Sequence, residues 1–263
     1  MKINFRAVNY STAIGLFLGL LLFAFIIFYS ANNSLAYLNI PSLLIIVLGT
    51  LSAVCLSYPL RDIKQALKSI RLILFYESLD PRQDAEEIIR VAHLWFNKDM
   101  LGVENLIDSI NNSYLKTGFQ LVIDNTPIDD ILTLLKWRIT RLRAKEQVAA
   151  NIFHSMANYS PAFGMVGTLV SLINMLQIIN AKDINAIGYN MGIALITTFY
   201  GLIFANLIFN PIAIKLERRT EQRVMIMSMV MEGIALIAER RTPAYIRETL
   251  ASFIVHYDNE LQR

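Results

Sequence analysis

The chain has 263 residues, of which 55% are hydrophobic and 17% are charged, and its 24 basic and 21 acidic residues leave a net charge of only +3. This balance excludes the strongly basic surface by which proteins bind nucleic acid. The single cysteine, Cys55, excludes an intrachain disulfide. Residues 7–60, 147–181 and 184–214 contain no Asp, Glu, Lys or Arg. Because an isolated charge is costly in hydrocarbon, these three stretches are compatible with lipid.

The first charge-free stretch is long enough to cross a bilayer twice, since one crossing needs roughly 20 apolar residues. A polar break near Asn33 divides it, and we predict helices at about 12–30 and 38–58. The other two stretches predict one span each, at about 158–179 and 188–210. The expected fold is an all-α integral membrane protein with four transmembrane helices. A cleaved signal peptide is disfavoured for the first span, because its apolar run exceeds the usual 7 to 15 residues.

The distribution of basic residues predicts the orientation of these spans. Two Lys or Arg residues precede the first span, thirteen lie between the second and third, one lies in the last hairpin loop and eight follow the fourth. The positive-inside rule therefore places both hairpin loops outside and both termini in the cytoplasm.

The long insert between the second and third spans has the composition of a soluble helical domain. Asp80 and Pro81 are typical of a helix start, and acidic residues follow near its positive end. Further helices are predicted over about 103–115 and 128–150, with an interruption at Gly118. The basic residues of the 128–150 helix run towards the membrane and its lipid headgroups, and we interpret them as a solvated face.

The tail is expected to continue the fourth helix and to pack on the insert. We divide the chain into four parts. These are an N-terminal segment with spans one and two (1–60), a cytoplasmic helical domain (61–156), spans three and four (157–214) and cytoplasmic C-terminal helices (215–263).

Small and hydroxyl residues recur at helical spacing in the third and fourth predicted spans. Because this spacing places them on one face of each helix, a neighbouring backbone can approach closely. We expect these faces to make helix contacts or to line a polar pathway. They comprise Ser160, Gly164, Gly167, Thr168 and Ser171 in the third span, and Thr197, Thr198, Gly201, Ala205, Asn206 and Asn210 in the fourth.

Pro161 and Pro211 form a pair near the predicted cytoplasmic ends of spans three and four. The two helices run in opposite directions, so both prolines are expected at similar depth. Each lacks an amide proton and disrupts the bond to the carbonyl four residues earlier. The loss of a backbone hydrogen bond in both helices at the same membrane depth predicts that the two helices bend there. The alternative is that Pro161 only starts its span and Pro211 only ends one.

Several of these segments resemble the MotA/PomA subunits of the bacterial flagellar stator. Residues 161–170 (PAFGMVGTLV) are similar to the signature of the family's third helix, and residues 191–201 (MGIALITTFYG) and 210–213 (NPIA) to that of its fourth. The resemblance covers nearly the whole chain. It implies a five-subunit ring in the bacterial inner membrane, around two copies of a single-span partner, MotB or PomB. That partner carries the ion-binding Asp, which agrees with spans that contain no carboxylate here.

The resemblance also implies roles for individual residues. Thr168, Thr197 and Thr198 match the hydroxyls that line the ion path, and Pro161 and Pro211 match the prolines that couple ion flow to conformational change. The transported cation is Na+ or H+; Na+ prefers several oxygen ligands and would bind the three threonines transiently, but the same residues suit a hydrated proton path. No other cofactor or metal is implied.

The family's ring turns the rotor protein FliG through charged residues of the insert. They include a basic residue and, eight positions later, a Glu. Glu104 fits the Glu, but the basic position falls on Phe96. Lys98 lies two residues from it and Arg90 about one and a half turns earlier, so we predict a rotor contact through Arg90, Lys98 and Glu104.

Three other classes of function remain for comparison, of which a passive scaffold of four helices predicts no motility defect when Thr198 or Pro161 is altered. ExbB/TolQ-like proteins also drive a periplasmic partner with ion flow, but they have three spans. An intramembrane enzyme would need a nucleophile with a base, a carboxylate pair or a metal cluster. The spans have no Asp or Glu, and His93, His154 and His256 fall outside the predicted spans without metal-ligand spacing, so we expect no enzyme.

Overall fold

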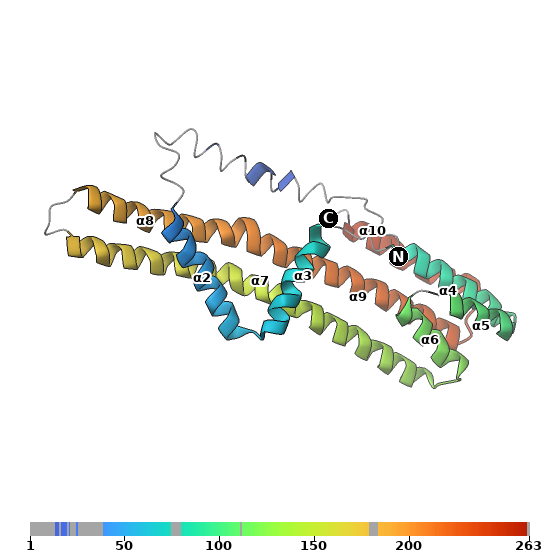
Figure 1. Ribbon diagram of the computed structural model, residues 1–263. Coiled ribbons are helices and arrows are strands. Elements are labelled where there is room, and N and C mark those ends of the chain that lie inside the picture. The colour runs from blue at the N-terminus through green and yellow to red at the C-terminus, as the bar shows by residue number, and fades with distance from the viewer. Residues whose placement is uncertain are drawn as a thin grey trace. The chain divides into compact units, whose positions relative to one another are not determined.

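The computed structural model describes residues 39–74, 80–110, 112–178 and 184–261, with positions 14, 15, 17–19, 21 and 25 near the N-terminus. All regular structure in these residues is helical (Figure 1). The predicted first span at 12–30 lies largely outside them. The helices are α2 (Ile40–Ser57), α3 (Leu60–Leu74), α4 (Pro81–Phe96), α5 (Met100–Ser109), α6 (Ser113–Ile123), α7 (Ile128–Ile178), α8 (Ile184–Ile203), the π-helix η3 (Phe204–Phe209), α9 (Asn210–Ala238) and α10 (Pro243–Leu261).

Three of the described helical segments are long and apolar enough to cross a membrane: Ile40–Ser57, Ile128–Ile178 and Ile184–Ala238. The first agrees with the predicted helix at 38–58. The second merges the predicted helix at 128–150 with the predicted span at 158–179 into one helix of 51 residues. No residue between these two segments supplies a turn, and the helix also continues through Pro161.

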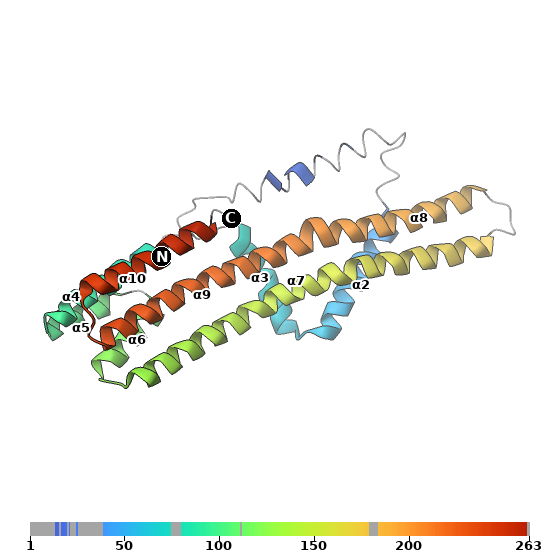
Figure 2. The ribbon, with the colours of Figure 1, turned by 180° about the vertical axis from the view of Figure 1, so that it is seen from behind.

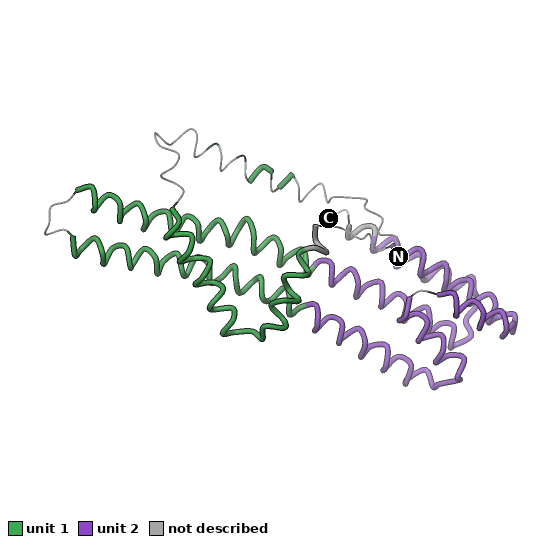
Figure 3. The backbone as a smooth tube through the Cα atoms, viewed as in Figure 1, with its two compact units in different colours: residues 1–77, 147–217 green, residues 78–146, 218–263 purple. Residues whose placement is uncertain are grey.

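The chain forms two compact units (Figure 3). Unit 1 comprises residues 1–77 and 147–217, and unit 2 comprises residues 78–146 and 218–263. In unit 1, both views of the ribbon show α8 running alongside the second half of α7, with α2 crossing this pair (Figures 1 and 2). The core of unit 1 holds side chains from α2, α3, α7 and α9. It includes Val54, Ala66, Ala150, Ile152, Phe153, Met156, Ala213 and Leu216.

Unit 2 has a single core to which the insert and the tail both contribute. α4 starts as its sequence predicts, because the Asp80 carboxylate accepts a hydrogen bond from the Arg82 amide at 3.0 Å and Pro81 occupies the first turn of the helix. Apolar side chains at helical spacing then face one another across the unit. The fully buried members include Ile88, Leu115, Phe119, Ile131, Leu135, Met229, Ile234, Ile237 and Ile246.

The predicted helix at 103–115 is wrong, because the structure has two helices there. α5 ends at Ser109, and Asn112 caps α6 by accepting hydrogen bonds from the amides of Tyr114 and Leu115. Gly118 does not interrupt the pattern either. It lies buried within α6, where a methyl group at this position would collide with the Ile234 side chain, so the glycine permits close packing.

Asn112 also holds a partly buried carboxylate. Its side-chain amide donates to both Asp84 carboxylate oxygens, at 3.0 and 3.1 Å. Burial raises the pKa of Asp84, the Asn112 bond opposes this shift, and nearby Asp80 adds to it. A pKa that is higher in the folded chain means that ionised Asp84 lowers stability above its unfolded pKa. This penalty shrinks as the pH falls below the folded pKa and is gone below the unfolded pKa.

We therefore expect Asp84→Asn to be no less stable than the wild type at neutral pH, with a gain of at most about 1 kcal/mol. The difference should vanish in acid, where the wild-type carboxyl is protonated. Thermal unfolding followed between pH 4 and pH 7 measures both effects. Asp108→Asn, at a carboxylate that is 82% exposed, is the control. An Asp84→Asn variant that is clearly less stable at neutral pH would contradict the assigned cost of burial.

Candidate functional site

The small-residue faces of α7 and α8 meet at very short range. A methyl carbon placed on Gly164 would lie 3.2 Å from the Thr198 Cα and 3.3 Å from the Thr197 carbonyl oxygen. One placed on Gly201 would lie 2.8 Å from the Ser160 carbonyl oxygen. The buried Ser160 hydroxyl donates to the Gly201 carbonyl oxygen at 3.1 Å. The two backbones therefore touch, which is the arrangement that small residues permit in membrane helices.

Thr197 lies where α2, α7 and α8 come together, and it is fully buried. Its hydroxyl donates to the Ser42 hydroxyl of α2 at 2.9 Å and lies 2.6 Å from the Ile193 carbonyl oxygen of its own helix. Ser42 in turn donates to the Asn39 side-chain oxygen at 3.0 Å. The Thr197 methyl group faces Gly167, where a Cβ atom would collide with it. The structure thus uses the Thr197 hydroxyl to join α2 to α8.

Ser42 was missed by the sequence reasoning. It belongs to a buried stripe on α2 in which every fourth residue faces the other helices, formed by Ser42, Ile46, Thr50 and Val54. The signal for Ser42 is a set of polar residues at helical spacing in an otherwise apolar span. In the sequence, we consider this signal only in the third and fourth spans.

Thr168 and Thr198 have more open surroundings than Thr197. Both are partly exposed, and the Thr168 hydroxyl donates to the Met165 carbonyl oxygen of its own helix at 2.6 Å. The Thr198 backbone lies against Gly164. The three predicted ion-path threonines therefore share one pair of helices but differ in access, since one hydroxyl is enclosed and two residues are partly exposed.

Both prolines lie within continuous helical segments. α7 runs through Pro161, and α9 includes Pro211 at its second position. Neither proline therefore begins or ends a continuous helical segment, while their position at the ends of the membrane spans stays a prediction. Just before Pro211 the helix widens into η3, and the Asn210 amide donates to the Ala205 carbonyl oxygen five residues earlier. A wide turn of this kind accommodates a residue without an amide proton.

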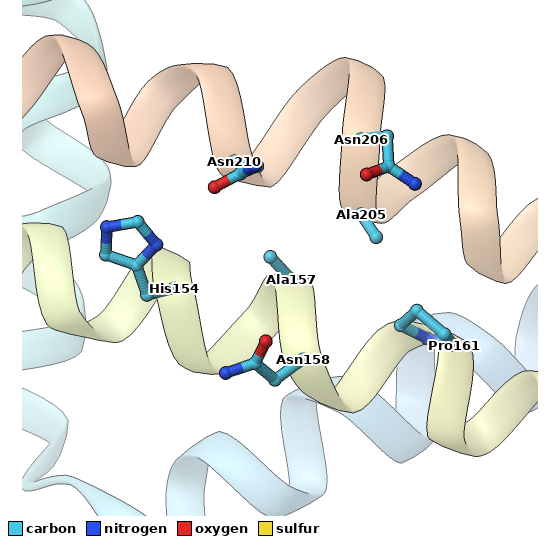
Figure 4. Close-up of a pocket in the computed structure, with 7 residues that line it drawn as sticks. All are labelled: His154, Ala157, Asn158, Pro161, Ala205, Asn206 and Asn210. Atoms are coloured by element: carbon cyan, nitrogen blue, oxygen red, sulfur yellow. The ribbon is translucent and has the colours of Figure 1, made fainter.

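A polar cavity with a volume of about 320 Å³ lies beside these wide turns in unit 1 (Figure 4). One wall comes from α7 and the other from η3 and the start of α9. Its lining residues are His154, Ala157, Asn158, Pro161, Ala205, Asn206 and Asn210. Pro161 lines the cavity directly, and Asn210 immediately precedes Pro211. The two prolines thus adjoin one cavity.

His154 occupies one end of this cavity and bonds to an acidic residue of α9. Its Nε2 atom lies 3.1 Å from the Glu217 carboxylate, which also accepts a hydrogen bond from the Gln147 side-chain amide at 3.0 Å. The sequence shows no metal-ligand spacing for His154 and gives it no role. Its spacing with Asn158 and Pro161, one helical turn apart, was the signal that these residues share a face.

The three residues predicted to contact a rotor lie in unit 2, and all are exposed. Arg90 is on α4, Glu104 is on α5, and Lys98 is in the turn between them with a positive φ of 61°. Phe96, at the position where the resemblance expects a basic residue, is 55% exposed.

The sequence of this chain is similar to those of known proteins. The MotA/TolQ/ExbB proton channel family matches residues 106–229. Chemotaxis protein PomA of Vibrio alginolyticus is 30% identical over 86% of this chain and 87% of its own length. The chain belongs to the MotA/PomA family. The family match runs from within α5 to within α9, and the similarity to PomA extends over most of the MotA/PomA family member's length.

Solved structures support the same fold for this MotA/PomA family member. The structure of C. jejuni MotAB superposes with a TM-score of 0.85, over 93% of this chain and 95% of that one, at 20% sequence identity. The flagellar MotAB stator complex from Bacillus subtilis gives a TM-score of 0.78 at 24% identity, over 91% and 94%. The similarity therefore extends along nearly the whole of each chain.

Proposed function

We propose that this chain is the channel-forming stator subunit of a bacterial flagellar motor, which converts cation flow into torque. The observation that carries the proposal is its likeness to PomA and to the MotAB structures over nearly its full length. The charge-free spans add a physical reason. They cannot bind and release a cation through a carboxylate, so a single-span partner of the MotB or PomB type brings the ion-binding Asp.

The membrane arrangement follows from the charge distribution. The chain crosses the inner membrane four times, with 12–30 as the first span, and the insert and both termini lie in the cytoplasm. The insert and the tail, which share the core of unit 2, form the cytoplasmic domain. Five copies make a ring around the partner, and no enzymatic activity or resident cofactor is part of the proposal.

The mechanism assigns different tasks to the residues of unit 1. Thr168 and Thr198 line the path along which Na+ or H+ moves. Thr197 holds α2 against α8 and so maintains the shape of this path. Protonation of the partner's Asp, or sodium binding to it, changes which ring subunit it contacts. The prolines at positions 161 and 211 let α7 and the α8–α9 segment flex as the ring turns.

Unit 2 transmits torque from the ring to the rotor. Arg90, Lys98 and Glu104 are exposed and carry both signs of charge, as contact with the charged surface of the rotor protein FliG requires. An ExbB/TolQ-like energiser of another periplasmic partner is the second candidate, because the matching family includes those proteins.

Co-purification and motility together test the proposed function. The tagged chain should carry with it a single-span protein that has one intramembrane Asp, and deletion of the gene should stop swimming without loss of flagella. Recovery of a different periplasmic partner in its place, with normal swimming after deletion, would support the second candidate.

Thr198→Val is expected to lower torque while the protein remains in the membrane, because it removes a hydroxyl from the ion path and keeps the side-chain shape. Rotation of tethered cells measures torque, and immunoblots of the membrane fraction measure the amount of protein. The control is Thr140→Val, at an exposed threonine of unit 2. Equal torque in the two variants would show that the Thr198 hydroxyl does not line the ion path.

A further inference from the structure

The cavity beside Pro161 has a lining suited to a small cation. Three carboxamides, those of Asn158, Asn206 and Asn210, line a space of about 320 Å³. Since one water molecule occupies about 30 Å³, this volume holds a cation together with part of its hydration shell. Carboxamide oxygens are among the ligands that hard cations prefer, so this wall can hold a cation wherever the asparagine oxygens face the space.

The orientation of Asn206 leaves its oxygen available. Its side-chain nitrogen donates to the Leu202 carbonyl oxygen at 2.9 Å, which occupies the amide group within its own helix. The side-chain oxygen is then the free end, and in Figure 4 it lies on the side of Asn210. The oxygen of Asn158 points in the same view towards Ala157 and the opposite wall. Oxygen atoms from both walls are thus available to a bound ion.

Negative charge is supplied at the end of the cavity where His154 lies. The Glu217 carboxylate bonds to the imidazole Nε2 atom, and neutral Gln147 is its other partner. In Figure 4 the second ring nitrogen of His154 lies on the side of Ala157 and Pro161, within the lined space. The His154 ring therefore connects the cavity to a carboxylate, whose charge attracts a cation.

We propose that this cavity binds the transported monovalent cation, Na+ or hydronium, after it leaves the partner's carboxylate and before it enters the cytoplasm. Asn158, Asn206 and Asn210 supply the oxygen ligands, and the Glu217 carboxylate, with the His154 imidazole in its neutral form, supplies the local charge. The inference rests on the proposed function and adds a second cation site to it, one formed by this chain alone. Its place beside Pro161 and Pro211 lets occupancy of the cavity respond to bending of the helices.

The test compares two asparagines of the same helical segment. Asn206 and Asn190 each donate to the carbonyl four residues earlier at 2.9 Å, and Asn206 lines the cavity whereas Asn190 is not among its lining residues. Asn206→Ala and Asn190→Ala therefore remove the same helix contact, and only the first removes a cavity oxygen. Each variant is expressed as the full chain with its partner, and motor speed is measured as sodium chloride is exchanged for potassium chloride at constant pH.

If the ion is sodium, Asn206→Ala should raise the half-saturating sodium concentration about fivefold, the effect of one lost ligand, and Asn190→Ala should leave it unchanged. If rotation continues without sodium, the same fivefold change should appear as a shift of about 0.7 pH unit in the pH dependence of speed. If motor speed in Asn206→Ala depends on sodium concentration or pH as it does in the wild type, the cavity does not bind the cation. The proposed function is unaffected by that result, because the wild-type motor still rotates. Should Asn206→Ala fail to reach the membrane, Asn158→Ala on the opposite wall carries the same expectation.

Discussion

Gly201→Val is expected to separate α7 from α8 and to abolish motor function. The first added carbon would lie 2.8 Å from the Ser160 carbonyl oxygen and 3.2 Å from the Pro161 Cα atom. Both are backbone atoms, so no side-chain rotation relieves the collision, and the helices must move apart. The separation would also break the bond from the Ser160 hydroxyl to the Gly201 carbonyl oxygen. Van der Waals packing and such bonds hold membrane helices together, since lipid is as apolar as the helices themselves.

Gly192→Val is the matched control for this change. Gly192 lies on the same helix, and a carbon added there meets no atom within 4 Å. The two variants share the change in helix propensity and differ only in the contact. Thermal unfolding in detergent and swimming in soft agar should show a large loss for Gly201→Val and little change for Gly192→Val. Equal melting temperatures would contradict the close contact between α7 and α8.

Phe119→Ala is expected to lower the free energy of unfolding by about 3 to 5 kcal/mol, because it opens a cavity in the core of unit 2. The Phe119 side chain is 1% exposed and packs in the core to which the insert and tail contribute. Most domains are stable by only about 5 to 15 kcal/mol, so much of this unit's stability would be lost. We expect low protein levels and no torque.

Phe96→Ala provides the comparison, because the same side chain is removed from a site that is 55% exposed. Limited proteolysis of the full chain in membranes measures the effect, with cleavage within residues 78–146 as the readout. Rapid cleavage is expected for Phe119→Ala and wild-type resistance for Phe96→Ala. Equal resistance of both variants would show that the core does not depend on Phe119.

Much of the helical plan was predictable from hydrophobic periodicity and capping residues. The span at 38–58 agrees with α2 within two residues, and Asp80 with Pro81 begins α4 as predicted. Errors occurred where tertiary packing overrides local signals. Gly118 suggests a break by itself, but it lies within α6 because Ile234 needs the space.

The candidate site was less predictable, because its residues come from separate segments. The small-residue faces correctly indicated that α7 and α8 approach closely. The role of Thr197 depends on Ser42 of α2, more than 150 positions earlier, and no pattern within one span reveals that bond. The cavity likewise depends on the pairing of α7 with η3 and α9. His154 alone gave no sign of its bond to Glu217, which lies 63 positions later.

The closeness of α7 and α8 also constrains the location of the conduit. With Gly164 against the backbone of Thr197 and Thr198, and Gly201 against Ser160, the line between the two helices has no width for a water molecule of about 1.4 Å radius. Cations therefore cannot pass between α7 and α8 at the level of these glycines. They must travel along the outer face of the helix pair until they reach the cavity beside Pro161, so the second half of the channel wall along α7 and α8 belongs to another polypeptide, and an isolated copy of this chain should be impermeable.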